Sequence, residues 1–219
     1  MAALAALRSG AGLVSVTSGE ATLMAPELMT ESLENFTLER KTVLAVGPGL
    51  GPRKELVERL MREAAIPMVI DADGLNSIAG TDFHGRGVET VLTPHPGEMA
   101  RLTGAAVTDR LGVARQFAKD RHVCLVLKGY RTLIATPDGN VWINTTGSPG
   151  MATGGTGDIL TGMIAGLIAQ FPGEIATAVR AAVWLHGRAG ELGAAELTEQ
   201  CLIATDLLRY LPKAIQELA

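Results

Sequence analysis

Four apolar runs rich in β-branched residues recur along the chain, and segments with helical spacing separate them. The runs are continuous rather than alternating in polarity, which is typical of parallel strands that helices cover on both faces. Strands are expected at residues 13–17, 42–46, 68–71 and 123–127, and helices at residues 53–65, 97–103 and 108–120. This alternation predicts an α/β protein with a central, mostly parallel sheet.

The two ends of the chain differ from this alternating middle. Residues 1–8 are interpreted as a helix that leads into the first strand. Residues 132–135 and 141–144 predict a β-hairpin, because the Asp138-Gly139 pair between them favours a tight turn. After Gly150 only helices are expected, at residues 155–170, 173–193 and 205–218. No linker or repeat interrupts the sequence, so residues 1–219 are interpreted as one domain.

Charge and cysteine content exclude some classes of function. The net charge of −4 argues against a general nucleic-acid binder, which needs a basic surface for phosphate contacts. No apolar run approaches the ~20 residues of a membrane-spanning helix. Cys124 and Cys201 lack the spacing of a zinc site and are interpreted as buried thiols. Free thiols are typical of a reducing compartment, so a cytoplasmic protein is expected.

The strongest functional signal is a glycine-dense loop, residues 144–158, that runs directly into a long apolar helix. The first turn of a helix has N–H groups without intrahelical partners, and glycines allow a phosphate to approach them. Gly154, Gly155, Thr156 and Gly157 therefore predict an anion cradle, and Asp158 beside it is a candidate general base for a substrate hydroxyl. The alternative is an ordinary glycine-rich loop with a favourable acid in the first helical turn.

Two further motifs are expected at strand ends, where ligands bind in open α/β sheets. Gly47, Gly49 and Gly51 form a turn that either lets a ligand approach the backbone or only connects a strand to a helix. Asp71 and Asp73 follow the next strand. Their carboxylates either hold Mg²⁺ through water or cap the following helix.

The last two motifs involve a histidine and a lysine. His95 lies between Pro94, which is expected to end a strand, and Pro96, so this stiff loop favours a ligand contact. Glu98 either bonds a ligand or water or caps the helix that follows. Lys128 with Gly129 either neutralises a nucleotide phosphate or belongs to a β-turn.

Taken together and in this order, these motifs resemble the ADP/ATP-dependent NAD(P)H-hydrate dehydratases of the ribokinase-like superfamily. The matching segments span nearly the entire chain and are residues 6–14, 47–51, 71–76, 93–98, 127–129 and 154–158. The resemblance implies a three-layer sandwich and a repair reaction on the 6-hydroxy hydrates of NADH and NADPH (NADHX and NADPHX). The hydroxyl is phosphorylated from ADP or ATP with Mg²⁺, and elimination of phosphate restores the reduced nicotinamide.

The resemblance also implies roles for individual residues. Asp158 is implied as the base that acts on the hydroxyl of the hydrate. Gly49 and His95, with Gly47 and Gly51, are implied as contacts of the hydrate. The implied contacts of the adenine nucleotide are Gly155, Thr156 and Gly157 together with Lys128, Gly129, Tyr130, Arg131 and Thr132.

The sequence departs from the family in one respect. In the family, a strand and a glycine-rich turn precede the helix that here begins at Met1. We therefore expect a ribokinase-like domain without its first strand, either a piece of a fusion with an NAD(P)H-hydrate epimerase or a shortened relative. A homo-oligomer is also expected, a tetramer by resemblance. Two alternatives stay open: a small-molecule hydroxyl kinase of the hydroxyethylthiazole or pyridoxine type, and an inactive nucleotide-binding module.

Overall fold

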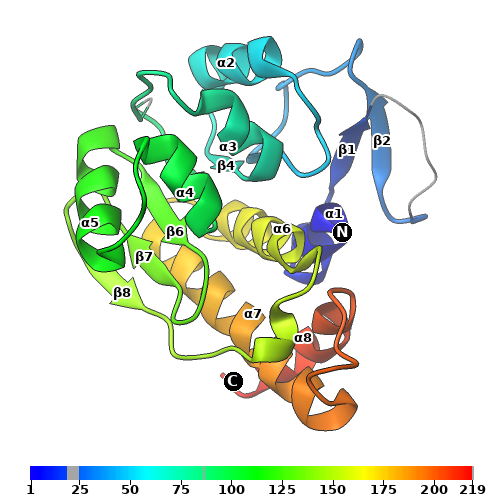
Figure 1. Cartoon of the computed structure of the whole chain (residues 1–219). Coiled ribbons are helices and arrows are strands. Elements are labelled where there is room, and N and C mark those ends of the chain that lie inside the picture. The colour runs from blue at the N-terminus through cyan, green and yellow to red at the C-terminus, as the bar shows by residue number, and fades with distance from the viewer. Residues whose placement is uncertain (19–24, 86, 219) are drawn as a thin grey trace.

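The computed structural model describes residues 1–18, 25–85 and 87–218 and contains a central sheet of six strands (Figure 1). The strands are β3 (Leu44–Val46), β4 (Met68–Ile70), β5 (Thr90–Leu92), β6 (Cys124–Leu127), β7 (Leu133–Ala135) and β8 (Val141–Ile143). They lie side by side in chain order. The strands from β3 to β6 are parallel, and β7 and β8 add an antiparallel hairpin. The predicted mostly parallel sheet and its hairpin are therefore confirmed.

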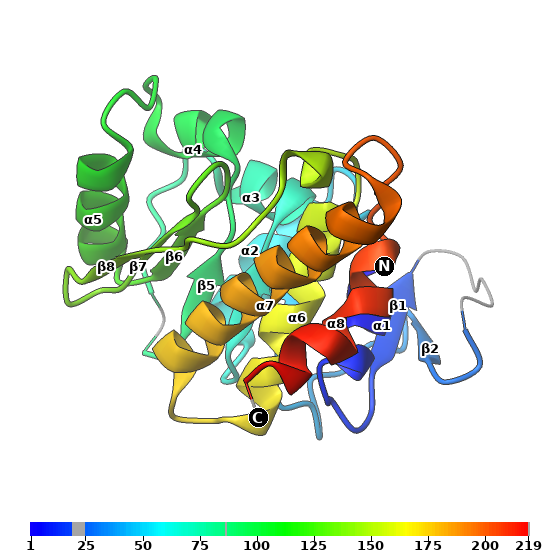
Figure 2. The ribbon, with the colours of Figure 1, turned by 90° about the horizontal axis from the view of Figure 1, so that it is seen from below.

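Helices cover both faces of this sheet and make the molecule a three-layer sandwich (Figure 2). One face carries α2 (Lys54–Glu63), α3 (Ala72–Ile78), α4 (Pro96–Thr103) and α5 (Arg110–Arg121). The other face carries α1 (Ala2–Arg8), α6 (Thr156–Gln170), α7 (Ile175–Leu197) and α8 (Asp206–Gln216). Successive strand residues point to opposite faces, so Met68 and Ile70 pack on the first layer and Val69 on the second.

The N-terminal part of the chain differs from the prediction. The first predicted strand is β1 (Ser15–Ser18), and it pairs in parallel with β2 (Met29–Ser32) in a separate two-stranded sheet. Leu13, which was expected inside this strand, precedes it and is 81% exposed. The strands of the central sheet are covered by helices on both faces. The run that contains the exposed Leu13 lacks this cover and lies outside the central sheet.

Two smaller features were also not predicted correctly. Helix α3, which follows Asp71 directly, was given no bounds from the sequence, because its glycine and asparagine are poor helix formers. Cys201 is exposed in the turn between α7 and α8, so the prediction of a buried thiol is wrong there. Cys124 is buried in β6 as expected, and burial raises the pKa of its thiol to about 12.

In the central sheet of the described residues, β3 and β8 are the two edge strands. The absence of a preceding family strand stays a prediction. None of the helices in the described ranges combines the length and apolar character that crossing a membrane requires.

Candidate active site

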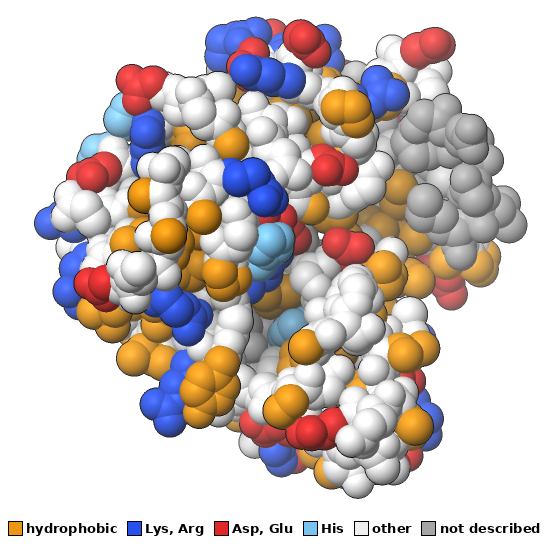
Figure 3. Space-filling view, viewed as in Figure 1, with side chains coloured by type: hydrophobic (Ala, Val, Ile, Leu, Met, Phe, Trp, Pro, Cys, Tyr) orange, Lys and Arg blue, Asp and Glu red, His pale blue; other side chains and the backbone are white. Residues whose placement is uncertain are grey.

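The sequence motifs meet at one edge of the sheet because the four parallel strands end there. Gly47 follows β3, Asp71 follows β4, Thr93 follows β5 and Lys128 follows β6. The backbone hydrogen bonding continues past the strand ends, since the Asp71 N–H donates to the Val46 carbonyl at 3.1 Å. Figure 3 shows a hollow in this face of the molecule, beside the N-terminal end of α6, with acidic, basic and histidine side chains around it.

Helix α6 begins at this edge without a side-chain cap. Its N-cap is Gly155, with a φ of 93°. The N–H groups of Thr156, Gly157 and Asp158 have no hydrogen-bond partner among the residues that the structure describes. The positive φ of Gly155 is a backbone conformation that residues with a Cβ rarely adopt, so the position favours glycine. Free first-turn amides are the donors that an anion requires, which supports the predicted cradle.

Lys128 follows β6, and its side chain reaches the N-terminal end of α6. Its Nζ donates to Asp71 Oδ1 at 2.6 Å and lies 3.8 Å from Glu98 Oε2. A Cβ added at Gly157 would lie only 3.3 Å from the same nitrogen, so the ammonium is beside the first turn of α6. The site therefore combines free amides with one positive side chain, which is the chemistry that a phosphate group needs.

Asp158 lies in the first turn of α6 and is half-buried. Burial raises the pKa of its carboxyl above the ordinary value, and the nearby charge of Asp71 raises it further. The amino group of Met1 and the ammonium of Lys128 act in the opposite direction. A carboxylate with a raised pKa is a stronger base than an exposed aspartate, so the environment suits proton removal.

His95 and Glu98 together cap α4. The Nδ1 atom of His95 accepts from the N–H of Gly97 at 3.0 Å and from the N–H of Glu98 at 3.3 Å. Glu98 Oε2 accepts from the His95 N–H at 2.7 Å, which completes a capping box. The helix-capping alternative for Glu98 is thus what the structure contains. Because Nδ1 is an acceptor, Nε2 carries the proton of the neutral ring, and it lies 3.6 Å from Glu98 Oε2.

The glycine turn after β3 packs on the start of α3. A Cβ at Gly47 would lie 1.7 Å from the Asp71 carbonyl, so this position requires glycine. The Gly51 N–H donates to Asp73 Oδ2 at 2.8 Å. The turn is therefore fixed against the strand end of β4, and the ligand contacts of Gly47, Gly49 and Gly51 stay a prediction.

Asp71 and Asp73 point to different partners. Asp71 is the N-cap residue of α3 but makes no side-chain cap bond, because its carboxylate is occupied by Lys128 and by Thr161. Within the described part of the chain, no group of three acidic, histidine or cysteine side chains could hold a metal ion directly. The prediction of a water-mediated Mg²⁺ contact stays a prediction.

The loop after β6 presents its side chains to solvent. Tyr130 is 82% exposed and carries the guanidinium of Arg131 over its ring at 5.4 Å. The hydroxyl of Thr132 donates to the Gly129 carbonyl at 3.0 Å. Arg110 of α5 holds the loop by donating to the Tyr130 carbonyl at 2.7 Å. Side-chain donors to its backbone carbonyls therefore hold this segment, and the ring of Tyr130 stays exposed.

These features agree with the comparison between the chain and known proteins. Residues 1–213 match the family described as NAD(P)H-hydrate dehydratase. The chain belongs to the NAD(P)H-hydrate dehydratase family. The resemblance stated from the motifs is therefore confirmed over nearly the whole length.

Individual members of the family support the same assignment. The chain is 43% identical over 252 residues to the bifunctional NAD(P)H-hydrate repair enzyme Nnr of Moorella thermoacetica, and the match covers 100% of the chain and 46% of that protein. The chain thus spans about half the length of this relative. In fold it matches an ADP/ATP-dependent NAD(P)H-hydrate dehydratase of Bacillus subtilis, with a TM-score of 0.89 and 34% identity, covering 100% of this chain and 86% of that one.

A third comparison identifies the fold. A ribokinase-like superfamily protein of Enterococcus faecalis has a TM-score of 0.87 and 31% identity, covering 100% of this chain and 81% of that one. The predicted ribokinase-like α/β fold is confirmed.

Sequence reasoning missed three residues of this dehydratase-family site. They are Thr161, whose hydroxyl donates to Asp71, His186, whose ring bonds the first turn of α6, and Arg110. Thr161 did carry a signal, because it is a polar residue inside an otherwise apolar helix, one turn after Asp158. His186 and Arg110 carried none, since their partners are backbone atoms distant in the sequence.

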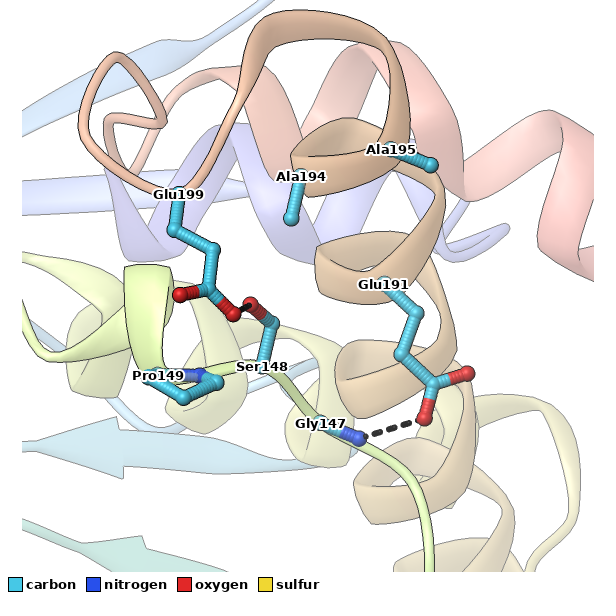
Figure 4. Close-up of a pocket in the computed structure, with 7 residues that line it drawn as sticks. All are labelled: Gly147, Ser148, Pro149, Glu191, Ala194, Ala195 and Glu199. Carbon is cyan, nitrogen blue, oxygen red and sulfur yellow. Dashed lines mark hydrogen bonds between the residues drawn. The ribbon is translucent and has the colours of Figure 1, made fainter.

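The loop that leads into α6 is held by two acids (Figure 4). Glu191 of α7 accepts from the Gly147 N–H at 2.9 Å, and Glu199 accepts from the Ser148 hydroxyl at 3.2 Å. These contacts line a cavity of about 360 Å³ between the loop and the end of α7. They fix the direction in which the glycine-dense segment enters the helix.

Proposed function

We propose that this chain catalyses the nucleotide-dependent dehydration of (S)-NADHX and (S)-NADPHX to NADH and NADPH. The observation that carries the proposal is the juxtaposition of free first-turn amides, the Lys128 ammonium and a half-buried Asp158 in a member of the dehydratase family. Transfer of a phosphoryl group to a hydroxyl requires a site that binds the phosphate donor, a positive charge and a base. The amides, the ammonium and the carboxylate match these requirements in that order.

Asp158 is the proposed catalytic residue. It removes the proton of the 6-hydroxyl, and the oxygen attacks the terminal phosphorus of the nucleotide, which leaves as AMP from ADP or as ADP from ATP. The C–O bond of the phosphate ester then breaks, and loss of a ring proton restores the dihydronicotinamide with release of inorganic phosphate. Burial of the carboxylate assists the first step because it raises the proton affinity of the base.

The nucleotide is proposed to lie against the end of α6 and the loop after β6. Gly155, Thr156 and Gly157 would donate amides to the transferable phosphate, and Lys128 would neutralise it. Gly129, Tyr130, Arg131 and Thr132 would contact the remainder of the nucleotide, and the exposed ring of Tyr130 offers a stacking surface.

The hydrate is proposed to lie on the side of β3 and β5. Gly49 and His95 would contact it, with Gly47 and Gly51 keeping the backbone accessible. His95 Nδ1 is used for capping, so the Nε2–H of this half-exposed side chain, 3.6 Å from Glu98 Oε2, is the group available to donate to a substrate oxygen.

The Bacillus subtilis relative was co-crystallised with ATP and Mg²⁺, and we propose the same ion here. Asp71 and Asp73 would bind Mg²⁺ only through water molecules. Asp71 already accepts from Lys128 and Thr161, and Asp73 accepts from Gly51. Each carboxylate oxygen has further lone pairs that can accept from water bound to a hard cation. Mg²⁺ would supply additional neutralisation of the phosphates.

The deciding experiment is an assay with the purified chain, each hydrate and either ADP or ATP with Mg²⁺. Recovery of the NADH absorbance band together with release of phosphate supports dehydration. A stable phosphorylated alcohol without that band would instead support a hydroxyl kinase. ADP binding without any turnover, unchanged in Asp158→Asn, would support an inactive nucleotide-binding module.

We also propose that residues 1–219 act as one catalytic domain that works with an NAD(P)H-hydrate epimerase, because the Moorella relative is named as bifunctional. A tetramer is the proposed assembly. Light scattering of the purified chain, with and without the epimerase, measures the oligomeric state and the binding of the epimerase. A monomer that does not bind the epimerase would contradict this proposal.

A further inference from the structure

Asp71 is a buried carboxylate with two strong hydrogen-bond donors. It is 1% exposed, and its Oδ1 accepts from Lys128 Nζ at 2.6 Å. Its Oδ2 accepts from the hydroxyl of Thr161 at 2.7 Å. A buried charge is tolerated only when it is paired and hydrogen-bonded, so each oxygen depends on its partner. We call these three residues the Asp71 cluster.

Thr161 is the unexpected member of the Asp71 cluster. It is fully buried in α6, between residues such as Leu160 and Ile164 that belong to the apolar core. A threonine hydroxyl inside a helix ordinarily donates to the carbonyl four residues earlier. Here it donates across to the strand edge instead. Because Thr161 lies three residues after Asp158, both side chains are on the same side of α6.

Lys128 depends on the Asp71 cluster for its position. A lysine side chain has several rotatable bonds, and holding it in one rotamer costs conformational entropy. Its ammonium is nevertheless beside Gly157, at the place proposed for the transferable phosphate. Asp71 provides the short contact at 2.6 Å, whereas Glu98 is at 3.8 Å. The direction of the Asp71 carboxylate therefore decides where the ammonium lies.

We propose that Thr161 is a positioning residue for phosphoryl transfer. Its hydroxyl holds the Asp71 carboxylate in one orientation, and Asp71 in turn holds the Lys128 ammonium beside the free amides of α6. This inference rests on the proposed function, because it assigns the Asp71 cluster to the same nucleotide site. It goes further by naming a residue inside the apolar helix that touches neither substrate.

The test compares Thr161→Ser with Thr161→Cys. Both variants lose the same methyl group, but serine keeps a hydroxyl donor and a thiol is only a weak one. We expect Thr161→Ser to keep kcat and the nucleotide KM within about 2-fold of the unmodified chain. Thr161→Cys should lower kcat about 10-fold or more and raise the nucleotide KM, with an unchanged KM for the hydrate. Thr103→Val, which removes the hydroxyl of a helical threonine in α4, is the control for helix effects.

Equal kinetics in the serine and cysteine variants would overturn the inference, whether both are active or both impaired, because the hydroxyl would then not matter. Binding of ADP, measured by calorimetry on the same proteins, separates this result from failure of the proposed function. If the unmodified chain does not dehydrate either hydrate, the proposed function fails. A weaker ADP affinity in Thr161→Cys than in Thr161→Ser would still support the positioning role, and equal affinities would overturn it.

Discussion

His186 of α7 and Thr156 of α6 are joined by a hydrogen bond of 2.9 Å between the ring Nε2 and the backbone carbonyl. A carbonyl only accepts, so Nε2 carries the proton. The pKa of His186 is lowered to about 4, chiefly because the ring is buried. The bond to Thr156 opposes this shift, and the nearby charge of Lys128 contributes to it. The first turn of the proposed nucleotide site thus rests on a neutral buried histidine.

Acid should destabilise the fold through this histidine. The unfolded chain binds a proton at His186 near pH 6.5, whereas the folded chain binds it only near pH 4. The free energy of unfolding therefore decreases as the pH falls from about 6.5 to about 4, by about 3 kcal/mol in total. Denaturant unfolding across this range measures the loss. His186→Gln keeps an N–H donor without titrating, so its unfolding should depend less on pH, and identical pH slopes in both proteins would refute the assignment.

Replacing the proposed base should strongly lower turnover without unfolding the chain. Asp158→Asn keeps the size of the side chain but cannot take a proton, so kcat should fall by on the order of 10² or more. Circular dichroism and thermal unfolding serve as the fold control, and ADP binding should remain. Near-normal turnover in this variant would remove Asp158 from the mechanism.

The acid limb of the pH–rate profile, where kcat/KM falls at low pH, should reflect the environment of Asp158. A base must be deprotonated to act, so kcat/KM falls as the pH drops through the pKa of this carboxyl. Because burial and the charge of Asp71 raise that pKa, the limb should lie above the ordinary aspartate value of 3.8. The measurement is kcat/KM against pH at saturating nucleotide. A limb at or below the ordinary value would show that another group limits the reaction.

Removing the cation of the buried ion pair should destabilise the fold strongly. In Lys128→Met, the Asp71 carboxylate, whose side chain is 2% exposed, loses its closest positive partner. Breaking a buried pair in this way costs about 3–5 kcal/mol. The double variant Lys128→Met/Asp71→Asn also removes the charge of Asp71 and should recover part of the loss in denaturant unfolding. Additive losses in the double variant would contradict coupling between the two side chains.

Close packing between α1 and α6 should make Gly162 intolerant of a side chain. A Cβ at this position would lie 1.9 Å from the Ala2 carbonyl and 2.8 Å from the Ala5 Cβ. Gly162→Ala therefore forces the helices apart and should cost about 1–3 kcal/mol, the usual range for overpacking. Gly12→Ala is the matched control, since no heavy atom lies within 4 Å of its Cβ position. Equal unfolding free energies of the two variants would exclude this packing constraint.

Much of the central sheet and the position of the motifs were predictable from local sequence. The apolar runs of β4 and β6 have the continuous pattern that burial on both faces requires, and the parallel strands bring Asp71 and Lys128 to one edge. The place of β1 was not predictable, because an apolar run does not specify which strand it pairs with. The exposed position of Cys201 was missed for a similar reason, since its surroundings depend on how the turn between α7 and α8 packs.

The sequence by itself determined the layered α/β fold. It also determined the glycine-dense loop that leads into an apolar helix with Asp158 at its start. Strand and helix periods, and the phosphate-binding character of bare helix amides, are local properties that residue order encodes. Only the tertiary structure decided that Thr161 bonds Asp71 across 90 residues and that Lys128 reaches it across 57. Those contacts depend on the register of α6 against the ends of β4 and β6, and no local pattern in the sequence specifies that register.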